Sequence, residues 1–226
     1  MGINGKEFAR MLDCIYCDPV IPIDDVMEFC RVAKEKEFFL AFPAHTFLPE
    51  VKEFLKGSNT IVGAGCSLNS GEDPIELKAY YARLMVDKGA DEIDSVMSIP
   101  DFFSGRYHNV VNDVRAIRDA IGPDIPLKVI LEVPQMTDEQ IIKACELVIE
   151  GGADYIKTGT GLVGATTVHH VEVISKTARG RVKIKAAGGI RSIEIIDQMV
   201  ELGVDRFGVS YKNALALMEQ LDQRQA

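Results

Sequence analysis

Two lysines at the ends of short apolar segments are the residues whose type and spacing most clearly indicate chemistry. The stretch 153–191 contains Y-I-K-T-G-T-G, with Lys157, and K-I-K-A-A-G-G, with Lys185. One helix-length segment separates the two motifs, so they predict a strand–helix–strand unit with a lysine at the end of each strand. A lysine at the end of a buried strand is costly unless it has a function. Two of them on successive strands predict amine chemistry.

An amine that attacks a carbonyl must be neutral, whereas a free lysine has a pKa of about 10.4. Burial and a neighbouring cation both lower the pKa of a lysine. Neighbouring strands lie about 5 Å apart, so Lys157 and Lys185 are expected to reach one another. Each lysine would then disfavour protonation of the other.

Carboxylates near other strand ends could move the protons that such a reaction requires. Asp94, in E-I-D-S-V-M, is the leading candidate, and Asp13 lies at the end of an earlier segment. In L-K-V-I-L-E-V, side-chain alternation predicts that Lys128, Ile130 and Glu132 share one face.

The alternative for each lysine is a structural ion pair, which is the commoner role of a single strand-end lysine. Two such lysines together with inward carboxylates make that alternative weaker. Lys183 shares a strand face with Lys185. Lys185 is preferred for the site because it adjoins A-A-G-G at the C-terminal end of its strand.

The elements that must position these residues alternate regularly along the chain. The expected strands are 11–16, 38–42, 60–65, 92–97, 127–133, 155–158, 181–186 and 206–210. The expected helices are 24–36, 49–56, 72–88, 105–120, 137–151, 166–178, 192–202 and 212–221, with Thr137 as an N-cap.

Eight strand–helix units in 226 residues, about 28 residues each, predict an α/β fold of the (β/α)8 TIM-barrel type. The strands are apolar runs, as expected when both faces are covered. No linker or shift in composition divides the chain, so residues 1–226 are expected to form a single domain. In such a barrel, chemistry sits at the C-terminal ends of the strands. A doubly wound open sheet is less favoured, because no Gly-rich loop follows the first strand.

Small residues after the last two strands indicate a phosphate site. Gly188 and Gly189 follow the seventh strand, while Gly208 and Ser210 lie in and after the eighth. Barrels commonly bind phosphate at these positions through backbone N–H groups and a helix N-terminus. The alternative is that Gly188 and Gly189 form only a turn.

Composition and charge exclude several classes of protein. The net charge of −9 disfavours a general nucleic-acid binder, since phosphate contacts require clustered Lys and Arg. The longest apolar runs are too short to span a bilayer, and the first residues lack a signal-peptide core. We therefore expect a cytoplasmic protein that binds neither nucleic acid nor membrane.

The cysteines and histidines do not indicate a disulfide framework or a metal site. Five cysteines are scattered along the chain, and no second pair completes a zinc site with Cys14-x-x-Cys17. Reduced, structural thiols are expected. The histidines lack metal-ligand spacing and are expected to be solvated at the surface; they are His45, His108, His169 and His170. No cofactor and no metal are predicted.

In these motifs the chain resembles the deoxyribose-phosphate aldolases. The resemblance rests on G-A-D-E-I-D at 89–94, L-K-V-I-L-E at 127–132, G-A-D-Y-I-K-T-G-T-G at 152–161 and K-A-A-G-G-I-R at 185–191. Weaker similarity extends over most of the chain, including L-D at 12–13 and G-V-S at 208–210.

The resemblance implies a metal-free, class I aldolase that cleaves 2-deoxy-D-ribose 5-phosphate to glyceraldehyde 3-phosphate and acetaldehyde. Lys157 resembles the lysine that forms the Schiff base, and Lys185 the lysine that lowers its pKa. Asp94 resembles the proton-relay aspartate, with Lys128 in a supporting ion pair and Asp13 beside it. The positions that correspond to phosphate binding are Gly188, Gly189, Gly208 and Ser210.

The chain departs from the family pattern around the predicted pocket. Residues 14–16 read C-I-Y instead of threonines, residues 162–165 belong to a shorter loop, Tyr211 replaces a small hydroxyl residue, and the tail 222–226 lacks a terminal tyrosine. One alternative is therefore the same lysine chemistry on another sugar phosphate or aldehyde. A second is a non-catalytic barrel that binds a phosphorylated metabolite. A metal-dependent aldolase lacks a ligand set here. Small barrels of this type commonly pair, so a homodimer or higher homo-oligomer is expected.

Overall fold

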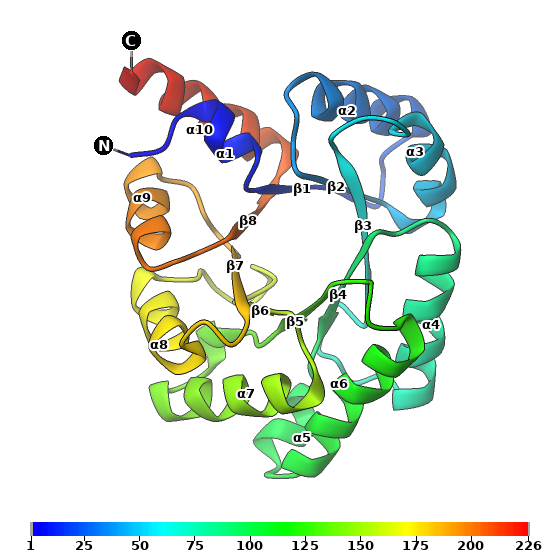
Figure 1. Ribbon diagram of the computed structural model, residues 1–226, viewed down its shortest axis with the longest axis vertical. Coiled ribbons are helices and arrows are strands. Elements are labelled where there is room, and N and C mark those ends of the chain that lie inside the picture. The colour runs from blue at the N-terminus through cyan, green and yellow to red at the C-terminus, as the bar shows by residue number, and fades with distance from the viewer. Residues whose placement is uncertain (1, 226) are drawn as a thin grey trace.

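Eight parallel strands close into a barrel in chain order, and β1 pairs with β8 (Figure 1). The structure, a computed structural model, describes residues 2–225. The strands are β1 (Leu12–Tyr16), β2 (Leu40–Pro43), β3 (Ile61–Cys66), β4 (Glu92–Val96), β5 (Leu127–Ile130), β6 (Tyr155–Lys157), β7 (Lys183–Ala187) and β8 (Arg206–Ser210). The predicted (β/α)8 fold is confirmed.

Helices surround the barrel on its outer face. They are α1 (Gly5–Ala9), α2 (Ile23–Glu35), α3 (Leu48–Phe54), α4 (Ile75–Asp87), α5 (Ile99–Phe103), α6 (Tyr107–Ile121), α7 (Asp138–Gly151), α8 (Val168–Ala178), α9 (Ile193–Glu201) and α10 (Tyr211–Gln225), with 3-10 helices η1 (His45–Phe47) and η2 (Val133–Gln135). The predicted capping box at Thr137 is confirmed. Sequence reasoning missed α1 and α5, because a five-residue helix is too short to show an apolar stripe.

The strands place two different sets of side chains on their two faces. Leu12, Cys14, Ile93, Val129 and others pack outward into the apolar layer beneath the helices. The alternate positions point into the barrel, and many of them are charged. Both faces are covered, as predicted, and the interior face carries the inward lysines and carboxylates expected from the sequence. The hydrophobic core therefore lies between sheet and helices, leaving the barrel axis for polar side chains.

Strand β5 ends earlier than predicted. It stops at Ile130, and Glu132 adopts a left-handed conformation with φ of 63°. Side-chain alternation does not continue through such a residue. The predicted common face for Lys128, Ile130 and Glu132 is therefore wrong at Glu132, which belongs to the loop after the strand.

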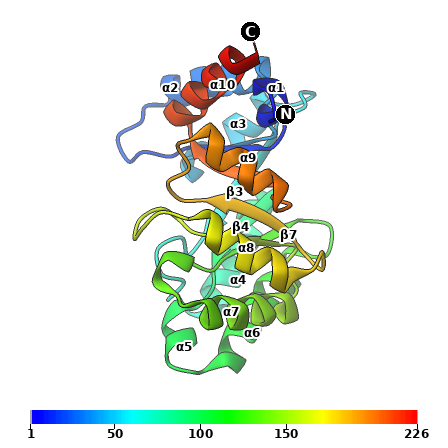
Figure 2. The same ribbon diagram turned by 90° about the vertical axis from the view of Figure 1, so that its left-hand side faces the viewer.

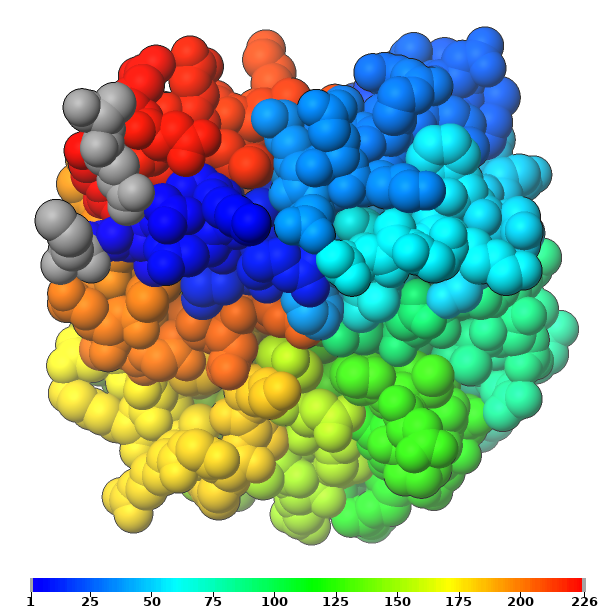
Figure 3. Space-filling model, turned by 45° about the horizontal axis from the view of Figure 1, so that its top comes forward, coloured from blue at the N-terminus to red at the C-terminus, as the bar shows by residue number. Residues whose placement is uncertain are grey.

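The two chain ends pack together at the barrel end from which the strands start. Asp222 on α10 accepts a hydrogen bond from the Gly5 backbone N–H, and Arg224 donates to the Ile3 carbonyl. Figure 3 shows the first residues, in dark blue, packed against the red C-terminal helix. The described part of the tail, through Gln225, thus continues α10 away from the lysine motifs; Ala226 lies outside the described residues.

A buried ion pair ties α4 to α6 and to the end of β4. The Lys78 ammonium donates to Asp113 Oδ2 at 2.6 Å and to the Val96 carbonyl at 2.8 Å, and neither side chain is more than 1% exposed. The Ser98 backbone N–H also donates to Asp113. Removing one partner of such a pair leaves an uncompensated buried charge.

Lys78→Met is therefore expected to lower the free energy of unfolding by about 3–5 kcal/mol, measured by urea denaturation. Lys88→Met, which removes an exposed lysine at the end of the same helix, is the control and should change stability by less than about 0.5 kcal/mol. Equal stability of the two variants would contradict a structural role for the ion pair.

Candidate active site

Asp94 bridges the two lysines that the sequence singled out. The Nζ atoms of Lys157 and Lys185 each lie 2.8 Å from Asp94 Oδ2. Lys157 and Lys185 are register partners on β6 and β7, so their side chains enter the barrel at the same height. Asp94 reaches both from β4, across the barrel interior. The fold thus brings together the three predicted catalytic residues, which are 63 and 91 positions apart.

A second layer of ion pairs supports this bridge from the other end of the barrel. Lys128 lies 3.1 Å from Asp13 Oδ2 and 3.3 Å from Asp94 Oδ1, and it also contacts Glu92. Asp13 Oδ2 in turn lies 2.7 Å from Lys185 Nζ, and Asp13 Oδ1 accepts a hydrogen bond of 3.1 Å from Arg206. The predicted supporting residues Lys128 and Asp13 therefore lie beside the catalytic candidates.

These seven residues form what we call the charge cluster: Asp13, Glu92, Asp94, Lys128, Lys157, Lys185 and Arg206. It contains four basic and three acidic groups, and each of them is buried. If every group were ionised, the cluster would carry one net positive charge. If one lysine is neutral, the cluster carries no net charge.

The environment of Lys157 lowers the pKa of its amine. Burial lowers the pKa of Lys157, and the positive charges of Lys185 and Lys128 lower it further, although Asp94 acts in the opposite direction. The pKa of Lys128 is raised despite burial, because Asp13, Asp94 and Glu92 surround its ammonium. The neutral form is therefore easier to reach for Lys157 than for Lys128.

The carboxylates remain ionised for the complementary reason. Burial alone would raise the pKa of Asp94, but Lys157, Lys185 and Lys128 together hold it well below its usual range. Burial opposes the same effect at Asp13, where Lys128, Lys185 and Arg206 lower the pKa to about 2. Asp94 can therefore accept a proton from either lysine only transiently, as a relay requires.

Lys157 is approached from the barrel end at which the loops after the strands gather. Its side chain is 6% exposed, whereas that of Lys185 is fully buried. Figure 2 shows the loops 17–22, 158–167 and 188–192 leaving the barrel on the same side. Lys183, not chosen for the site, is exposed at the start of β7, at the opposite end.

Hydroxyl residues that sequence reasoning missed hold the loop after Lys157. The Thr158 hydroxyl donates to the Ala187 carbonyl at 2.8 Å and accepts from the Ala187 N–H at 2.9 Å. The Thr166 hydroxyl lies 2.9 Å from that of Thr158 and also donates to Ala187. Both threonines are buried, so they fix the loop after β6 to the end of β7. Their position in T-G-T-G-x4-T was the available signal.

Glu132, in the loop after β5, holds the same loop. Its carboxylate accepts hydrogen bonds from the Thr160 backbone N–H at 3.1 Å and from the Thr160 hydroxyl at 2.6 Å. A Cβ on Gly159 would lie 2.9 Å from Glu132 Oε1, so the glycine leaves room for this contact. The two ends of the T-G-T-G motif are thereby held by neighbouring strands.

The predicted phosphate residues lie at this barrel end but differ in surroundings. Gly188 and Gly189 have φ of 94° and 75°, which favours glycine, and Gly188 packs against Gly161. Ser210 is exposed immediately before α10. Gly208 lies within β8, where an added Cβ would approach Lys185 Cε at 3.2 Å. The absence of a side chain at Gly208 therefore makes room for Lys185.

The departures at residues 14–16 are not all directed at the pocket. Cys14 is buried in the outer core, and the Tyr16 ring packs 5.3 Å from that of Tyr211 and 5.4 Å from that of Phe29. Ile15 alternates with these residues and shares the interior face with Asp13. The expectation that bulk at all these positions borders the substrate is wrong for Cys14. Among the departures at 14–16, Ile15 is the residue on the interior face of the barrel.

One histidine differs from its predicted surface role. The half-buried His45 ring accepts a hydrogen bond from the Gly65 N–H at 3.0 Å through Nε2, and its Nδ1 lies 3.0 Å from the Tyr81 hydroxyl. His45 thus joins η1 to β3 and α4. His108 and His169 are exposed, as predicted, and His170 belongs to the capping box of α8. All five cysteines are free, with Cys17 exposed.

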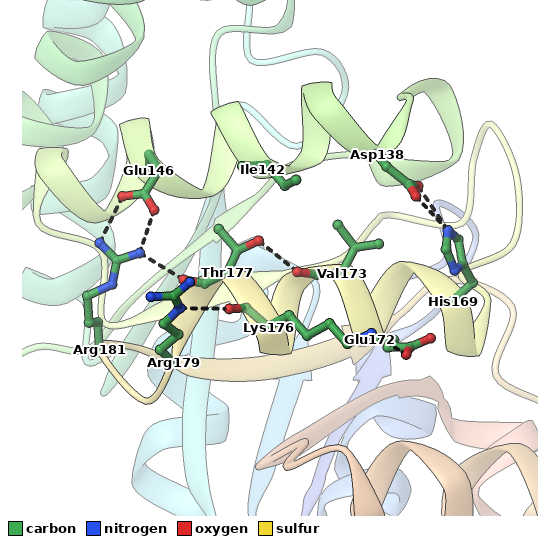
Figure 4. Close-up of a pocket in the computed structure, with 10 residues that line it drawn as sticks. All are labelled: Asp138, Ile142, Glu146, His169, Glu172, Val173, Lys176, Thr177, Arg179 and Arg181. Atoms are coloured by element: carbon green, nitrogen blue, oxygen red, sulfur yellow. Dashed lines mark hydrogen bonds and ion pairs between the residues drawn. The ribbon is translucent and has the colours of Figure 1, made fainter.

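A surface groove of about 780 Å³ between α7 and α8 lies outside the barrel (Figure 4). Ile142 and Val173 line its middle. Its charged residues pair with one another across it: Asp138 with His169 at one end, and Glu146 with Arg181 at the other. The groove is a helix–helix junction bridged by its own ion pairs, and it contains none of the charge cluster.

Within residues 2–225 the structure contains neither a metal-binding cluster nor a membrane-spanning helix. No group of three or more His, Cys, Asp or Glu side chains in that range is arranged to hold a metal ion. No helix in the same range is long and apolar enough to cross a membrane.

A closed (β/α)8 barrel with a lysine–carboxylate cluster at the C-terminal ends of its strands defines a barrel enzyme of the aldolase class. The family model described as DeoC/LacD family aldolase matches residues 57–211, and the chain belongs to this family. The resemblance inferred from the motifs is thereby confirmed.

Individual relatives agree with this assignment. The chain is 38% identical over 221 residues to a protein named deoxyribose-phosphate aldolase from Sinorhizobium medicae, covering 97% of this chain and 89% of that protein. The solved structure described as QR15, an aldolase, is 30% identical with a TM-score of 0.89 over 97% of both chains. A tetrameric deoxyribose phosphate aldolase from Aeropyrum pernix shares the fold, with a TM-score of 0.87, 24% identity, and coverage of 98% of this chain and 93% of that one.

Thr158→Val removes the hydroxyl that joins the two loops and leaves the Ala187 N–H without its partner. It is expected to cost about 1–3 kcal/mol of stability, as for an unsatisfied buried polar group. Thr158→Ser keeps the hydroxyl and is the matched control. The measurement is the free energy of unfolding in urea. If the valine and serine variants unfold at the same denaturant concentration, the hydroxyl does not fix these loops.

Proposed function

We propose that the protein is a class I aldolase in which Lys157 forms a Schiff base with a carbonyl donor. The observation that carries this proposal is the charge cluster, which is balanced when Lys157 is neutral. A neutral amine is the form that attacks a carbonyl carbon. In this role Lys185 keeps Lys157 neutral, and Asp94, 2.8 Å from both ammonium nitrogens, moves protons together with an ordered water.

The proposed substrate is 2-deoxy-D-ribose 5-phosphate, as the names of the relatives suggest. The Lys157 nitrogen bonds to C1, and loss of water gives an iminium. The C3 hydroxyl then loses its proton as the C2–C3 bond breaks, which releases glyceraldehyde 3-phosphate and leaves an enamine. Protonation at C2 and hydrolysis release acetaldehyde and restore the amine. Asp94 lies where it can relay these protons.

The phosphate is proposed to bind at the ends of β7 and β8. The backbone N–H groups of Gly188 and Gly189, the strand-end segment from Gly208 to Ser210, and the N-terminus of α10 lie on the loop side of the barrel. A helix N-terminus favours an anion because its first N–H groups have no intrahelical partner. This position would hold the substrate's phosphate while C1 reaches Lys157.

A second candidate is the same lysine chemistry on another sugar phosphate or aldehyde. Ile15 on the interior face, and Leu162 and Val163, which are 72% and 51% exposed in the loop after β6, favour a less polar acceptor. A panel of acceptor aldehydes would separate the two candidates. A barrel that only binds a phosphorylated metabolite is the non-catalytic alternative, and it predicts ligand binding without a lysine adduct.

We propose further that residues 1–226 act as one domain, with no cofactor or metal, in carbohydrate catabolism in the cytoplasm. The free cysteines support a reducing compartment. A homodimer or higher homo-oligomer is proposed from the expectation that small barrels of this type pair, and the Aeropyrum pernix relative is described as tetrameric. The net charge of −9 argues against nucleic acid as a partner.

Borohydride reduction in the presence of acetaldehyde or deoxyribose 5-phosphate is expected to trap an adduct on Lys157, located by peptide mass mapping. Lys157→Ala should lose the adduct and nearly all turnover while remaining folded. Lys183→Ala removes an exposed lysine from the same interior face and is the control; it should retain both. An adduct on Lys185 would show that the roles of the two lysines are reversed. If folded protein forms no adduct on any lysine with either compound, the proposed reaction is contradicted.

A further inference from the structure

Two members of the charge cluster, Glu92 and Arg206, have no contact with Lys157. Glu92 precedes Asp94 by two residues on β4 and so occupies the next interior position toward the start of the strand. Arg206 is the first residue of β8, one interior position before Gly208, which is the register partner of Asp13. Both are buried, at 4% and 8% exposure. They therefore form the floor of the cluster, away from the loops.

Their contacts lead to Lys157 through other charged groups. Glu92 contacts the Lys128 ammonium, which lies 3.3 Å from Asp94 Oδ1. Arg206 donates to Asp13 Oδ1 at 3.1 Å, while Asp13 Oδ2 lies 2.7 Å from Lys185. Glu92 is thus linked to Asp94 through one charged group, Lys128, and Arg206 through two, Asp13 and Lys185. A buried arrangement of this kind transmits a change in charge because screening by water is weak there.

Arg206 is held in place by more than its ion pairs. Its guanidinium lies over the Phe39 ring and 5.9 Å from the centroid of the Tyr155 ring. Its second ion-pair contact is to Glu92 Oε1, at 3.7 Å. Arg206 and Glu92 therefore face each other across the barrel floor with opposite charges, and both line a cavity of about 460 Å³ at the end of the barrel where the strands start.

We propose that Glu92 and Arg206 are positioning residues that set the charge balance of the Lys157 amine from the far end of the barrel, acting through Lys128 and Asp13. Glu92 supplies one of the three negative charges around the Lys128 ammonium, beside those of Asp13 and Asp94. Arg206 supplies one of the three positive charges around Asp13, beside those of Lys128 and Lys185. With both present, the cluster is neutral when Lys157 is neutral. The inference rests on the proposed function of Lys157 as the attacking amine.

The other titratable groups near Lys157 leave this balance unchanged. Tyr155 lies on the interior face of β6, and Lys183 is exposed to solvent over its ring, at 5.4 Å. Cys17, in the loop after β1, is the group nearest the open end; burial, the larger influence, raises its pKa, so the thiol stays neutral. Glu132, the buried carboxylate after β5, faces the loop after Lys157 and accepts hydrogen bonds from Thr160. The charged groups that contact Lys157 or Asp94 directly belong to the cluster.

The direction in which each of two substitutions shifts the pKa of Lys157 follows from the charge that it removes. Glu92→Gln removes a negative charge, which disfavours the protonated form of Lys157 and lowers its pKa. Arg206→Gln removes a positive charge, which favours the protonated form and raises the pKa. Each shift is expected to be roughly one pH unit, from a unit charge acting over two strand spacings at partial burial. Glu92→Gln with Arg206→Gln restores the balance and should return the titration close to that of the unsubstituted chain.

The test is competitive labelling of Lys157 with trace acetic anhydride across a pH series, read by peptide mass spectrometry. No substrate is present, so the readout is the titration of the amine itself. Glu92→Asp and Arg206→Lys keep the charges and are the matched controls, which should leave the midpoint unchanged. Shifts of opposite sign in the two glutamine variants, cancelling in the double variant, support the inference. Shifts of the same sign, or none, overturn it.

Folding is checked by circular dichroism for every variant. If Arg206→Gln does not fold, Glu92→Gln decides, because an unchanged or raised midpoint there contradicts the inference. Borohydride trapping on the unsubstituted chain separates this result from the proposed function. If trapping succeeds but the titration midpoints of Lys157 do not move in the variants, only the roles proposed for Glu92 and Arg206 are contradicted. Trapping that fails while the midpoints shift removes the aldolase reaction and leaves the charge balance established.

Discussion

The requirement that buried charges balance is the constraint on which this structure depends. Three carboxylates and four basic groups lie in the barrel interior. Isolated ions at that depth would be very costly, since the effective penalty is several kcal/mol per ion even after relaxation. The pairing pattern removes the penalty for six of them. The seventh, Lys157, is the one for which a neutral amine completes the balance, and a reactive group arises where the pairing is one partner short.

The fold provides the conditions for this arrangement by separating two interiors. Outward positions of the strands form the apolar core with the helices, so stability does not depend on filling the barrel axis with hydrocarbon. Glycine at position 208 leaves room for the Lys185 chain, while Tyr155 and Phe39 enclose the lower end. An apolar barrel interior would be easier to fold, but it would contain no amine with a lowered pKa.

The loop end and the floor of the barrel have different structural roles. At the loop end, Glu132, Thr158 and Thr166 hold the backbone after Lys157 with neutral and charge-assisted hydrogen bonds. Exposed apolar residues such as Leu162 lie beyond them and touch none of the cluster. Substrate preference can therefore vary at the rim without altering the ionisation of Lys157, which explains how the lysine motifs persist in a chain whose rim differs from the family pattern.

The sequence by itself determined the barrel, the order of its elements and the lysines and aspartates of the site, because these follow from local patterns: apolar runs, caps, and polar residues at strand ends. It did not determine the end of β5, since Glu132 takes a left-handed conformation that interrupts alternation. It gave no reason to single out Glu92 or Arg206, whose contacts join strands distant in the chain, nor to separate inward Ile15 from outward Cys14. The lowered pKa of Lys157 depends on burial and on charges from β4, β5 and β7, and only closure of the barrel brings those charges within a few ångströms of one another.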